Sequence, residues 1–144
     1  DRLEAAPVKE SVAGLRKELQ GVMQNYFGVF RKGDYMRQGI DQLNDLRTRI
    51  EAMGVADKTQ AFNTARIEAL ELQNLFEVAE ATAISAEQRT ESRGAHARED
   101  FQERDDENWL CHSIYDPLKK SLGKRSVNFA PQTMDAFEPK IRTY

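Results

Sequence analysis

The fold is decided by residues 57–94, which read DKTQAFNTARIEALELQNLFEVAEATAISAEQRTESRG. Within this stretch an apolar residue recurs at alternating steps of three and four. The row consists of Phe62, Ala65, Ala69, Leu72, Phe76, Ala79 and Ala83. This spacing keeps one face of a helix against a partner, so it predicts a long amphipathic helix over 57–93. Because a helix with so narrow an apolar face is not stable alone in water, other helices must pack against it.

Polar residues and a glycine mark the ends of this helix. Asp57, with Gln60 three residues later, is a variant of the capping box and favours a helix start at Asp57. Gly94 suits a left-handed C-terminal cap, which favours a helix end just before it.

Two further helical patterns lie upstream. Pro7 suits the first turn of a helix, and the apolar residues that follow it predict a helix over 7–27. A turn over 28–33 comes next, with Val29 and Phe30 as its apolar anchors. Asp34 is the expected N-cap of a second helix over 34–53.

Three amphipathic helices joined by short loops predict a mainly-α fold, an antiparallel three-helix bundle of the spectrin-repeat type over residues 1–94. The alanines in the apolar row allow close approach of the helices. We interpret the row as bundle core and not as a cofactor groove. Gly39, inside the second helix, is expected to cost roughly 1 kcal/mol relative to alanine.

The chain changes character after Gly94. Residues 91–107 hold seven acids and three arginines, and their helical periodicity stops. Residues 109–115 and 124–129 are predicted to be two strands of a β-hairpin.

An extended tail follows the hairpin, because Pro131 and Pro139 disfavour helix there. From Lys119 onward the chain holds six bases and two acids, so we expect it to lie near the acidic segment. Residues 95–144 are predicted to pack on the bundle as loop, hairpin and tail, which makes the whole chain one domain.

Composition excludes several classes of protein. The net charge of −3 argues against a nucleic-acid binder. The longest run without a charge, 19–30, is too short to cross a bilayer. Asp1 and Arg2 lead directly into helical sequence, so we expect no signal peptide. The lone Cys111 excludes an internal disulfide and fits a reducing, cytoplasmic compartment.

The search for an active site is mostly negative. The sequence has no G-x-G-x-x-G, P-loop, H-E-x-x-H or C-x-x-C motif. Cys111 and His112 are neighbours on an expected strand, so they point to opposite faces and do not form a nucleophile pair. Asp105-Asp106-Glu107 could bind a cation, although such runs are more often solvated or paired with arginine. We predict no catalytic, cofactor-binding or metal-binding residue in this chain.

The densest group of polar residues, 89–100, reads RTESRGAHARED. Arginine suits bidentate recognition of carboxylates, and alternating charges let such a segment lock against another polar surface. Two interpretations stay open: a helix end tied down by local ion pairs, or an interface. His96 is expected to be a hydrogen-bonded structural residue. The candidate interface residues are Arg89, Arg93, His96, Arg98, Asp100, Arg104, Asp105 and Asp106.

Residues 89–101 (RTESRGAHAREDF) and 104–112 (RDDENWLCH) closely resemble the C-terminal region of succinate dehydrogenase flavoprotein subunits. The GVFR of 28–31 and the PKIRTY of 139–144 resemble helical and terminal motifs of the same subunit. The ESRGAH motif is shared with fumarate reductase flavoproteins, whereas RDDENWLCH and the IRTY ending favour succinate dehydrogenase. One departure is Gln102, where the family pattern has proline.

The resemblance implies that this chain is the C-terminal helical domain of a longer flavoprotein. In that family the FAD-binding domain and the capping domain lie upstream, together with the flavin-linking and catalytic residues, and their motifs are missing from 1–144. The chain itself is therefore expected to hold no cofactor, while FAD belongs to the intact subunit.

For the intact subunit the resemblance implies oxidation of succinate to fumarate, with hydride transfer to FAD. Electrons then pass through an iron–sulfur subunit to quinone at the cytoplasmic face of the inner membrane. The membrane-anchor subunits would be partners of this chain only indirectly. This domain would be a rigid support that rests on the upstream domains or on a partner subunit.

Two alternatives remain at this stage. The chain could be the equivalent domain of a fumarate reductase or L-aspartate oxidase flavoprotein, or a free-standing helical-bundle interaction module. Coding sequence upstream of Asp1 distinguishes them.

Overall fold

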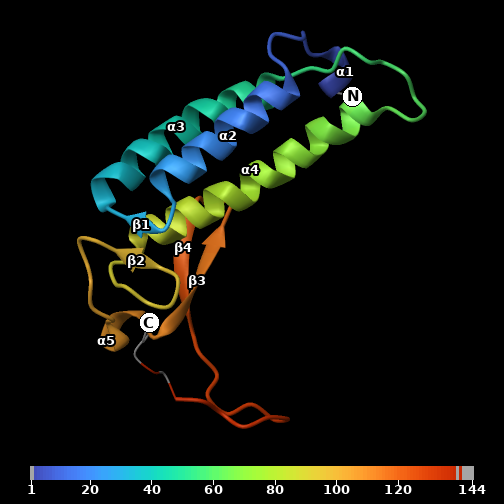
Figure 1. Ribbon diagram of the computed structural model, residues 1–144. Coiled ribbons are helices and arrows are strands. Elements are labelled where there is room, and N and C mark those ends of the chain that lie inside the picture. The colour runs from blue at the N-terminus through green and yellow to red at the C-terminus, as the bar shows by residue number, and fades with distance from the viewer. Residues whose placement is uncertain (1, 139, 141–144) are drawn as a thin grey trace.

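The computed structural model describes residues 2–138 and 140, and it consists mainly of helix (Figure 1). The three long helices are α2 (Val12–Tyr26), α3 (Gly33–Ala52) and α4 (Thr64–Gln88), and each packs against the other two. Two short helices, α1 (Arg2–Ala5) and α5 (Asp106–Trp109), complete the helical part. The prediction of a mainly helical fold is confirmed.

Four short strands form two separate pairs. β1 (Phe30–Arg31) and β2 (Ala97–Arg98) are parallel and join the start of α3 to the chain beyond α4. β3 (Cys111–Asp116) and β4 (Ser121–Ser126) form an antiparallel hairpin, with β3 against α4 (Figure 1).

The core is apolar and is shared by the three long helices. Its main members are Leu15, Leu19, Val22, Met36, Leu43, Leu46, Ile50, Ala69, Leu72, Phe76, Ala79, Ala83 and Ala86. The predicted row on α4 is therefore confirmed from Ala69 to Ala83. Ala69 and Ala83 are fully buried, and residues this small let neighbouring helices approach closely.

The predicted start of this helix at Asp57 is wrong. Asn63 is the N-cap of α4, because its side-chain oxygen accepts the Arg66 N–H at 2.8 Å. Its amide group also donates to two carbonyls of the preceding loop, which fixes that loop outside the helix. The Asp57 carboxylate instead accepts the Thr59 N–H. Phe62 has a positive φ of 54° and is fully exposed, so it is not part of the core.

The predicted end of this helix is also too late, because α4 stops at Gln88. Gly94 does have a positive φ of 56°, as a left-handed turn requires, but the turn joins Arg93 to His96 and is not the helix cap.

Several other predicted boundaries move. α2 begins at Val12 and not near Pro7, because Ser11 is its N-cap and accepts the Gly14 N–H at 3.0 Å. The prediction of Val29 and Phe30 as apolar anchors is wrong, since both side chains are more than 70% exposed. Phe30 contributes its backbone to β1 instead.

The second helix begins two residues earlier than an N-cap at Asp34 would place it. The N-cap position of α3 is Lys32, and Asp34 lies in the first turn of the helix. The end of this helix at Ala52 agrees with the prediction to within one residue.

The hairpin exists, but both of its strands are displaced from the prediction. Trp109 lies in α5, because Asp105 caps that short helix through the Asn108 N–H. Gly123 lies within β4 and not in the turn, which is made by 117–120 with Lys120 at a φ of 48°.

The tail after β4 has neither helix nor strand up to Glu138, as Pro131 led us to expect, whereas Pro139 lies outside the described residues. The expected proximity of basic tail and acidic segment is seen at two places among the described residues. The Lys124 ammonium group donates to Asn108 O and lies near Asp105. Farther along the tail, Phe129, Ala136, Phe137 and Glu138 line a pocket together with Arg104 and Asp106. No helix in the described part of the chain is long and apolar enough to cross a bilayer.

Gly39 contradicts the expectation that alanine is better at this position. A Cβ there would lie 2.6 Å from both Tyr26 Cβ and Phe27 Cε2, so α2 and α3 are close because this residue is glycine. We expect Gly39→Ala to destabilise the chain by about 1–3 kcal/mol, despite the higher helix propensity of alanine. Urea unfolding measures the change. Gly21→Ala is the matched control, because a Cβ there meets nothing within 4 Å and should be neutral or stabilising.

Candidate functional site

The candidate residues gather at one end of the long helices, where α3 begins and α4 ends (Figure 1). We call this group, together with a buried glutamate between two of its arginines, the polar cluster. It consists of Arg89, Glu91, Arg93, His96, Arg98, Asp100, Arg104, Asp105 and Asp106.

Arg98 joins the end of α4 to the start of α3. The residue is only 4% exposed, and its Nη1 donates to the carbonyls of Ala86, Glu87 and Arg89 at 2.8–3.2 Å. The same group binds Asp100 through two parallel hydrogen bonds of 2.7 and 2.9 Å. A cation at a helix C-terminus is favoured by the helix dipole.

Asp100 completes this connection at the opposite helix end. Its Oδ2 accepts the Gly33 N–H at 2.9 Å, so a carboxylate lies at the N-terminus of α3. The Arg98 hydrogen bonds, together with that of Gly33, hold the pKa of Asp100 well below its usual range. Arg98 and Asp100 thus act as one charged clamp between two helices.

Glu91 is the buried centre of the second half of the cluster. It is 0% exposed, and its carboxylate accepts Arg93 Nε at 2.8 Å, the Asp105 N–H at 2.8 Å and a hydrogen bond from Arg89. Burial alone would raise its pKa, but these three donors lower it instead. Glu91 is therefore ionised at neutral pH and fixes the loop that follows α4.

Arg89 ties the end of α4 to the hairpin. Its guanidinium group donates to Trp109 O at 3.0 Å and Cys111 O at 2.6 Å, and it lies 5.0 Å from the centre of the Trp109 ring. This stacking adds a cation–π contact to the hydrogen bonds.

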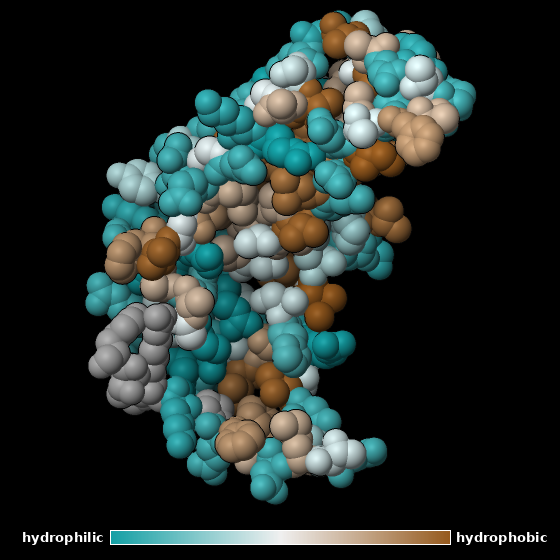
Figure 2. Space-filling model, turned by 45° about the vertical axis from the view of Figure 1, so that its right-hand side comes forward, coloured by the Kyte–Doolittle hydropathy of each residue, from teal (hydrophilic) through white to brown (hydrophobic). Residues whose placement is uncertain are grey.

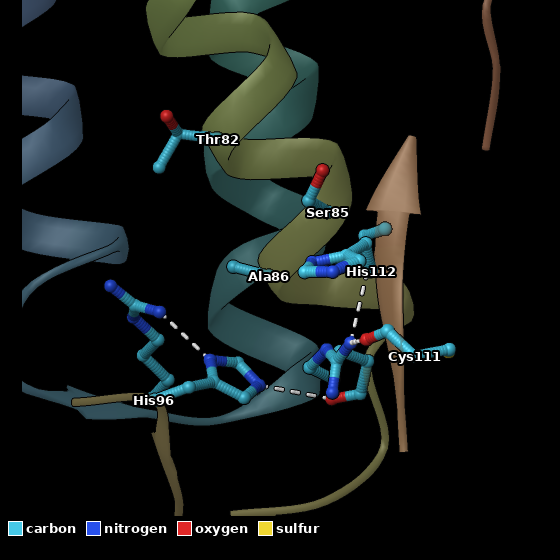
Figure 3. Close-up of a pocket in the computed structure, with 9 residues that line it drawn as sticks. Thr82, Ser85, Ala86, His96, Cys111 and His112 are labelled. Atoms are coloured by element: carbon cyan, nitrogen blue, oxygen red, sulfur yellow. Dashed lines mark hydrogen bonds between the residues drawn. The ribbon is translucent and has the colours of Figure 1, made fainter. Parts of the chain in front are cut away.

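His96 is held between two arginines (Figure 3). Arg31 Nη1 lies 2.8 Å from His96 Nδ1, and His96 Nε2 lies 3.0 Å from the Arg89 carbonyl oxygen. Because a guanidinium group only donates and a carbonyl only accepts, these contacts assign the neutral tautomer with its proton on Nε2. Burial lowers the pKa of His96, and the nearby arginines add to that effect. The prediction of a structural histidine agrees with this geometry.

A shallow hollow of about 370 Å³ lies beside His96, between the end of α4 and the start of β3 (Figure 3). Cys111 and His112 border it from successive positions of β3. Both nitrogens of His96 are already engaged, so that ring has no free lone pair with which to act as a general base. Through His96, the arrangement joins Arg31 of β1 to the residue that follows α4.

The acidic run is paired with arginine, as the more common interpretation predicted. Asp106 accepts from Arg93 at 2.5 Å and from Arg104 at 2.8 Å, while Asp105 caps α5. No group of three or more His, Cys, Asp or Glu side chains suitable for a metal ion occurs among residues 2–138 and 140.

Two residues were not among the predicted candidates: Glu91, which belongs to the polar cluster, and Arg31, which contacts its member His96. Glu91 lies two residues from an arginine on either side, and that symmetric spacing was the available signal. Arg31 lay in the GVFR segment, but nothing in the local pattern shows that β1 brings it to His96.

Comparison with known proteins decides the family. The family described as fumarate reductase flavoprotein C-term matches residues 16–144. The chain belongs to this family. It is 50% identical over 133 residues to a succinate dehydrogenase flavoprotein subunit of Coxiella burnetii, a match that covers 92% of the chain and 22% of the relative. It is 37% identical to the mitochondrial succinate dehydrogenase flavoprotein subunit of Oryza sativa, covering 100% of the chain and 24% of the relative.

Solved structures agree with this assignment. The chain superposes on the E. coli quinol fumarate reductase with a TM-score of 0.78 and 31% identity, covering 94% of the chain and 24% of that structure's chain. This C-terminal domain thus spans about a quarter or less of the length of the relatives it matches.

Proposed function

We propose that this flavoprotein C-terminal domain is the structural support of a succinate dehydrogenase flavoprotein subunit. The observation that carries the proposal is the 50% identity to such a subunit over nearly the whole chain, combined with coverage of only 22% of that relative. In the intact subunit, succinate would be oxidised to fumarate by hydride transfer to FAD. Electrons would then leave through an iron–sulfur subunit toward quinone at a membrane.

The residues of this domain do not fit FAD. The described strands form one two-residue parallel pair and one hairpin, and neither has the glycine-rich turn between strand and helix that holds a dinucleotide. The charged groups of the polar cluster are also engaged with one another. The flavin and the reacting groups are therefore assigned to the rest of the subunit, and no step of the reaction is assigned to this domain.

Its own contribution would be rigidity. We infer that α2, α3 and α4 act as an antiparallel three-helix bundle over 1–94, with 95–144 packed on it. Their mutual packing and shared core support this inference. Hydride transfer tolerates only small displacement of the reacting groups, so a stiff domain beside the flavin domain helps to maintain their geometry.

The polar cluster is proposed to contribute to an interface with the flavin domain or a partner subunit. Asp106, Asp100 and Arg104 are its more exposed charged members, with side chains that are 41%, 29% and 27% exposed. The buried members, Glu91 and Arg98, would fix the backbone that carries these exposed side chains.

The same domain of a fumarate reductase is the second candidate, since the E. coli structure that superposes so well is a quinol fumarate reductase. Both enzymes interconvert the same two dicarboxylates, so the role of the domain is common to them.

One experiment tests the proposal. We expect the full-length gene product to contain flavin and to reduce a dye with succinate, whereas the 144-residue chain shows neither flavin absorbance nor dye reduction. Flavin bound by the 144-residue chain would contradict the assignment. A reading frame that starts close to Asp1 would also contradict it and would favour a free-standing module.

A further inference from the structure

One arginine beside the polar cluster has no acidic partner. The four arginines of the cluster each form at least one ion pair with a carboxylate. Arg31 forms none within residues 2–138 and 140. Arg31 is half-buried, and this burial, together with the neighbouring Arg98, lowers its pKa. Because a partly desolvated cation is costly unless a negative charge lies beside it, the position favours an anion.

The direction of the Arg31 guanidinium group is fixed. Its Nε donates to Gly28 O at 3.1 Å, and its Nη1 lies 2.8 Å from His96 Nδ1. His96 is itself held through its other nitrogen by the Arg89 carbonyl. Arg31 Nη2 has no acceptor among the described residues, and the side chain borders the hollow of about 370 Å³. The group is therefore preorganised and still has donors for a ligand in this hollow.

The hollow is lined by further donors that the fold does not use. Ser85 of α4 and His112 of β3 border it, and Figure 3 shows both on the side away from His96. Neither side chain forms a hydrogen bond within the part of the chain that the structure describes. A hydroxyl group and an imidazole ring each carry at least one donor. Donors from β1, α4 and β3 thus converge on one open space.

Polarity distinguishes this hollow from the groove next to it. The groove, of about 680 Å³, also lies between α4 and β3, but its lining includes Val78, Ile114 and Pro117. Figure 2 shows apolar residues at the surface along this side of the molecule. Sites for small molecules commonly measure about 300–1,000 Å³, so the polar hollow can hold a whole small molecule.

We propose that the hollow beside His96 binds a small free carboxylate, which pairs with Arg31 and accepts hydrogen bonds from Ser85 and His112. The planar fork of a guanidinium group matches the two oxygens of a carboxylate. Among the described residues that line the hollow, Arg31 is the arginine that no carboxylate already neutralises. A carboxylate carries the single charge that Arg31 can balance, whereas a phosphate carries more at neutral pH. The inference is independent of the proposed function, because it uses only residues of this chain.

A nuclear magnetic resonance titration tests the proposal. The ¹⁵N-labelled 144-residue chain is titrated with sodium acetate, while sodium chloride keeps the ionic strength constant. We expect the backbone amide signals of residues 82–86 and 111–113 to move and to saturate. The dissociation constant should be on the order of 1 mM, which suits so small a ligand. Signals that do not move overturn the proposal. Tighter binding of sodium phosphate than of acetate overturns the choice of a carboxylate.

Three variants locate the site. Arg31→Gln should weaken acetate binding by about tenfold or more, because a charged donor is lost. Ser85→Ala leaves every described side-chain hydrogen bond in place and should weaken binding by about twofold to tenfold, so it decides the matter if Arg31→Gln perturbs the fold. Arg125→Gln is the matched control. Arg125 is exposed and lies opposite His112 in the hairpin, but it does not line the hollow.

We expect Arg125→Gln to change the dissociation constant by less than about twofold. If it weakens binding as much as Arg31→Gln does, acetate responds only to the general positive charge of this region, and the proposal is wrong. Unchanged binding in both Arg31→Gln and Ser85→Ala contradicts it equally.

The full-length gene product distinguishes a free carboxylate from an acidic side chain. Saturation transfer from the protein to the acetate methyl group is measured for the unmodified product and for Arg31→Gln. The part of the signal that Arg31→Gln removes reports this hollow, even where acetate also binds elsewhere. We expect this part to be present in the full-length product, as in the 144-residue chain. Its absence from the full-length product alone would show that another part of the polypeptide fills the hollow, and that no free ligand binds there.

Discussion

Leu72→Asp is expected to abolish cooperative folding of the chain. Leu72 is 0% exposed and lies in the middle of α4, where all neighbouring core residues are apolar. Removing a buried leucine side chain alone costs about 2–5 kcal/mol, and placing an unpaired carboxylate there costs several more. Because the total stability of a domain is typically about 5–15 kcal/mol, the variant should lose its thermal transition by circular dichroism.

Leu75→Asp is the matched control for this change. It introduces the same charge three residues later, at a side chain that is 41% exposed on the outer face of α4. We expect a loss of less than about 1 kcal/mol in the 144-residue chain. Equal melting temperatures for the two variants would show that the register of α4 is wrong. Leu72 is a cleaner site than Phe76, because the Arg47 guanidinium lies 5.0 Å from the Phe76 ring and would neutralise a carboxylate placed there.

The core residues of α4 could be predicted from sequence because packing requires apolar residues at helical spacing, and that spacing can be read directly from the sequence. Ala69, Leu72 and Phe76 obey the helical repeat and are buried. The same repeat included Phe62, which is exposed, because Asn63 is the N-cap and the helix begins only after it. Periodicity identifies a face, but capping decides where that face begins.

The end of α4 could not be found locally. Its last carbonyls are satisfied by Arg98, which lies nine to twelve residues further along the chain. Gly94 offered a plausible local cap, and its left-handed backbone conformation is real, but it belongs to the next turn. A helix end closed by a distant side chain leaves no signal next to the helix.

The candidate site, too, could be predicted from the sequence only in part. Charge and residue type predicted that residues 89–106 act together, and the structure brings the eight candidates to one end of the helices. The sequence left open whether these charges pair internally or face a partner, because the two cases use the same residues. Internal pairing is what the structure shows for Arg89, Arg93 and Arg98, so an interface role depends on the more exposed members.

Arg98→Ala is expected to destabilise the chain by about 2–4 kcal/mol, the cost of leaving buried hydrogen-bond acceptors without their donor. The change leaves three carbonyls at the end of α4 without their donor, and it removes the cation from Asp100. Chemical unfolding followed by circular dichroism measures the loss. Arg98→Lys should be intermediate, because lysine keeps the charge but not the planar fork that reaches both groups.

Arg104→Ala is the control within the polar cluster. Arg104 pairs with Asp106 near the surface, where both side chains remain partly exposed, so its loss should cost less than about 1 kcal/mol. If Arg98→Ala cost no more than Arg104→Ala, the clamp between α3 and α4 would not contribute to stability.

The pH dependence of unfolding separates the charge of Asp100 from the packing of Arg98. Because Arg98 lowers the pKa of Asp100 in the folded chain, ionised Asp100 stabilises the fold above its unfolded pKa of about 4. That stabilisation is lost as the pH falls through the lower folded value. In Arg98→Ala the main cause of the low pKa is gone, so the decline in stability below about pH 4 should be smaller than in the unmodified chain. An unchanged decline would show that other carboxylates, such as Glu91, cause it, and that the Arg98–Asp100 pair acts through its geometry alone.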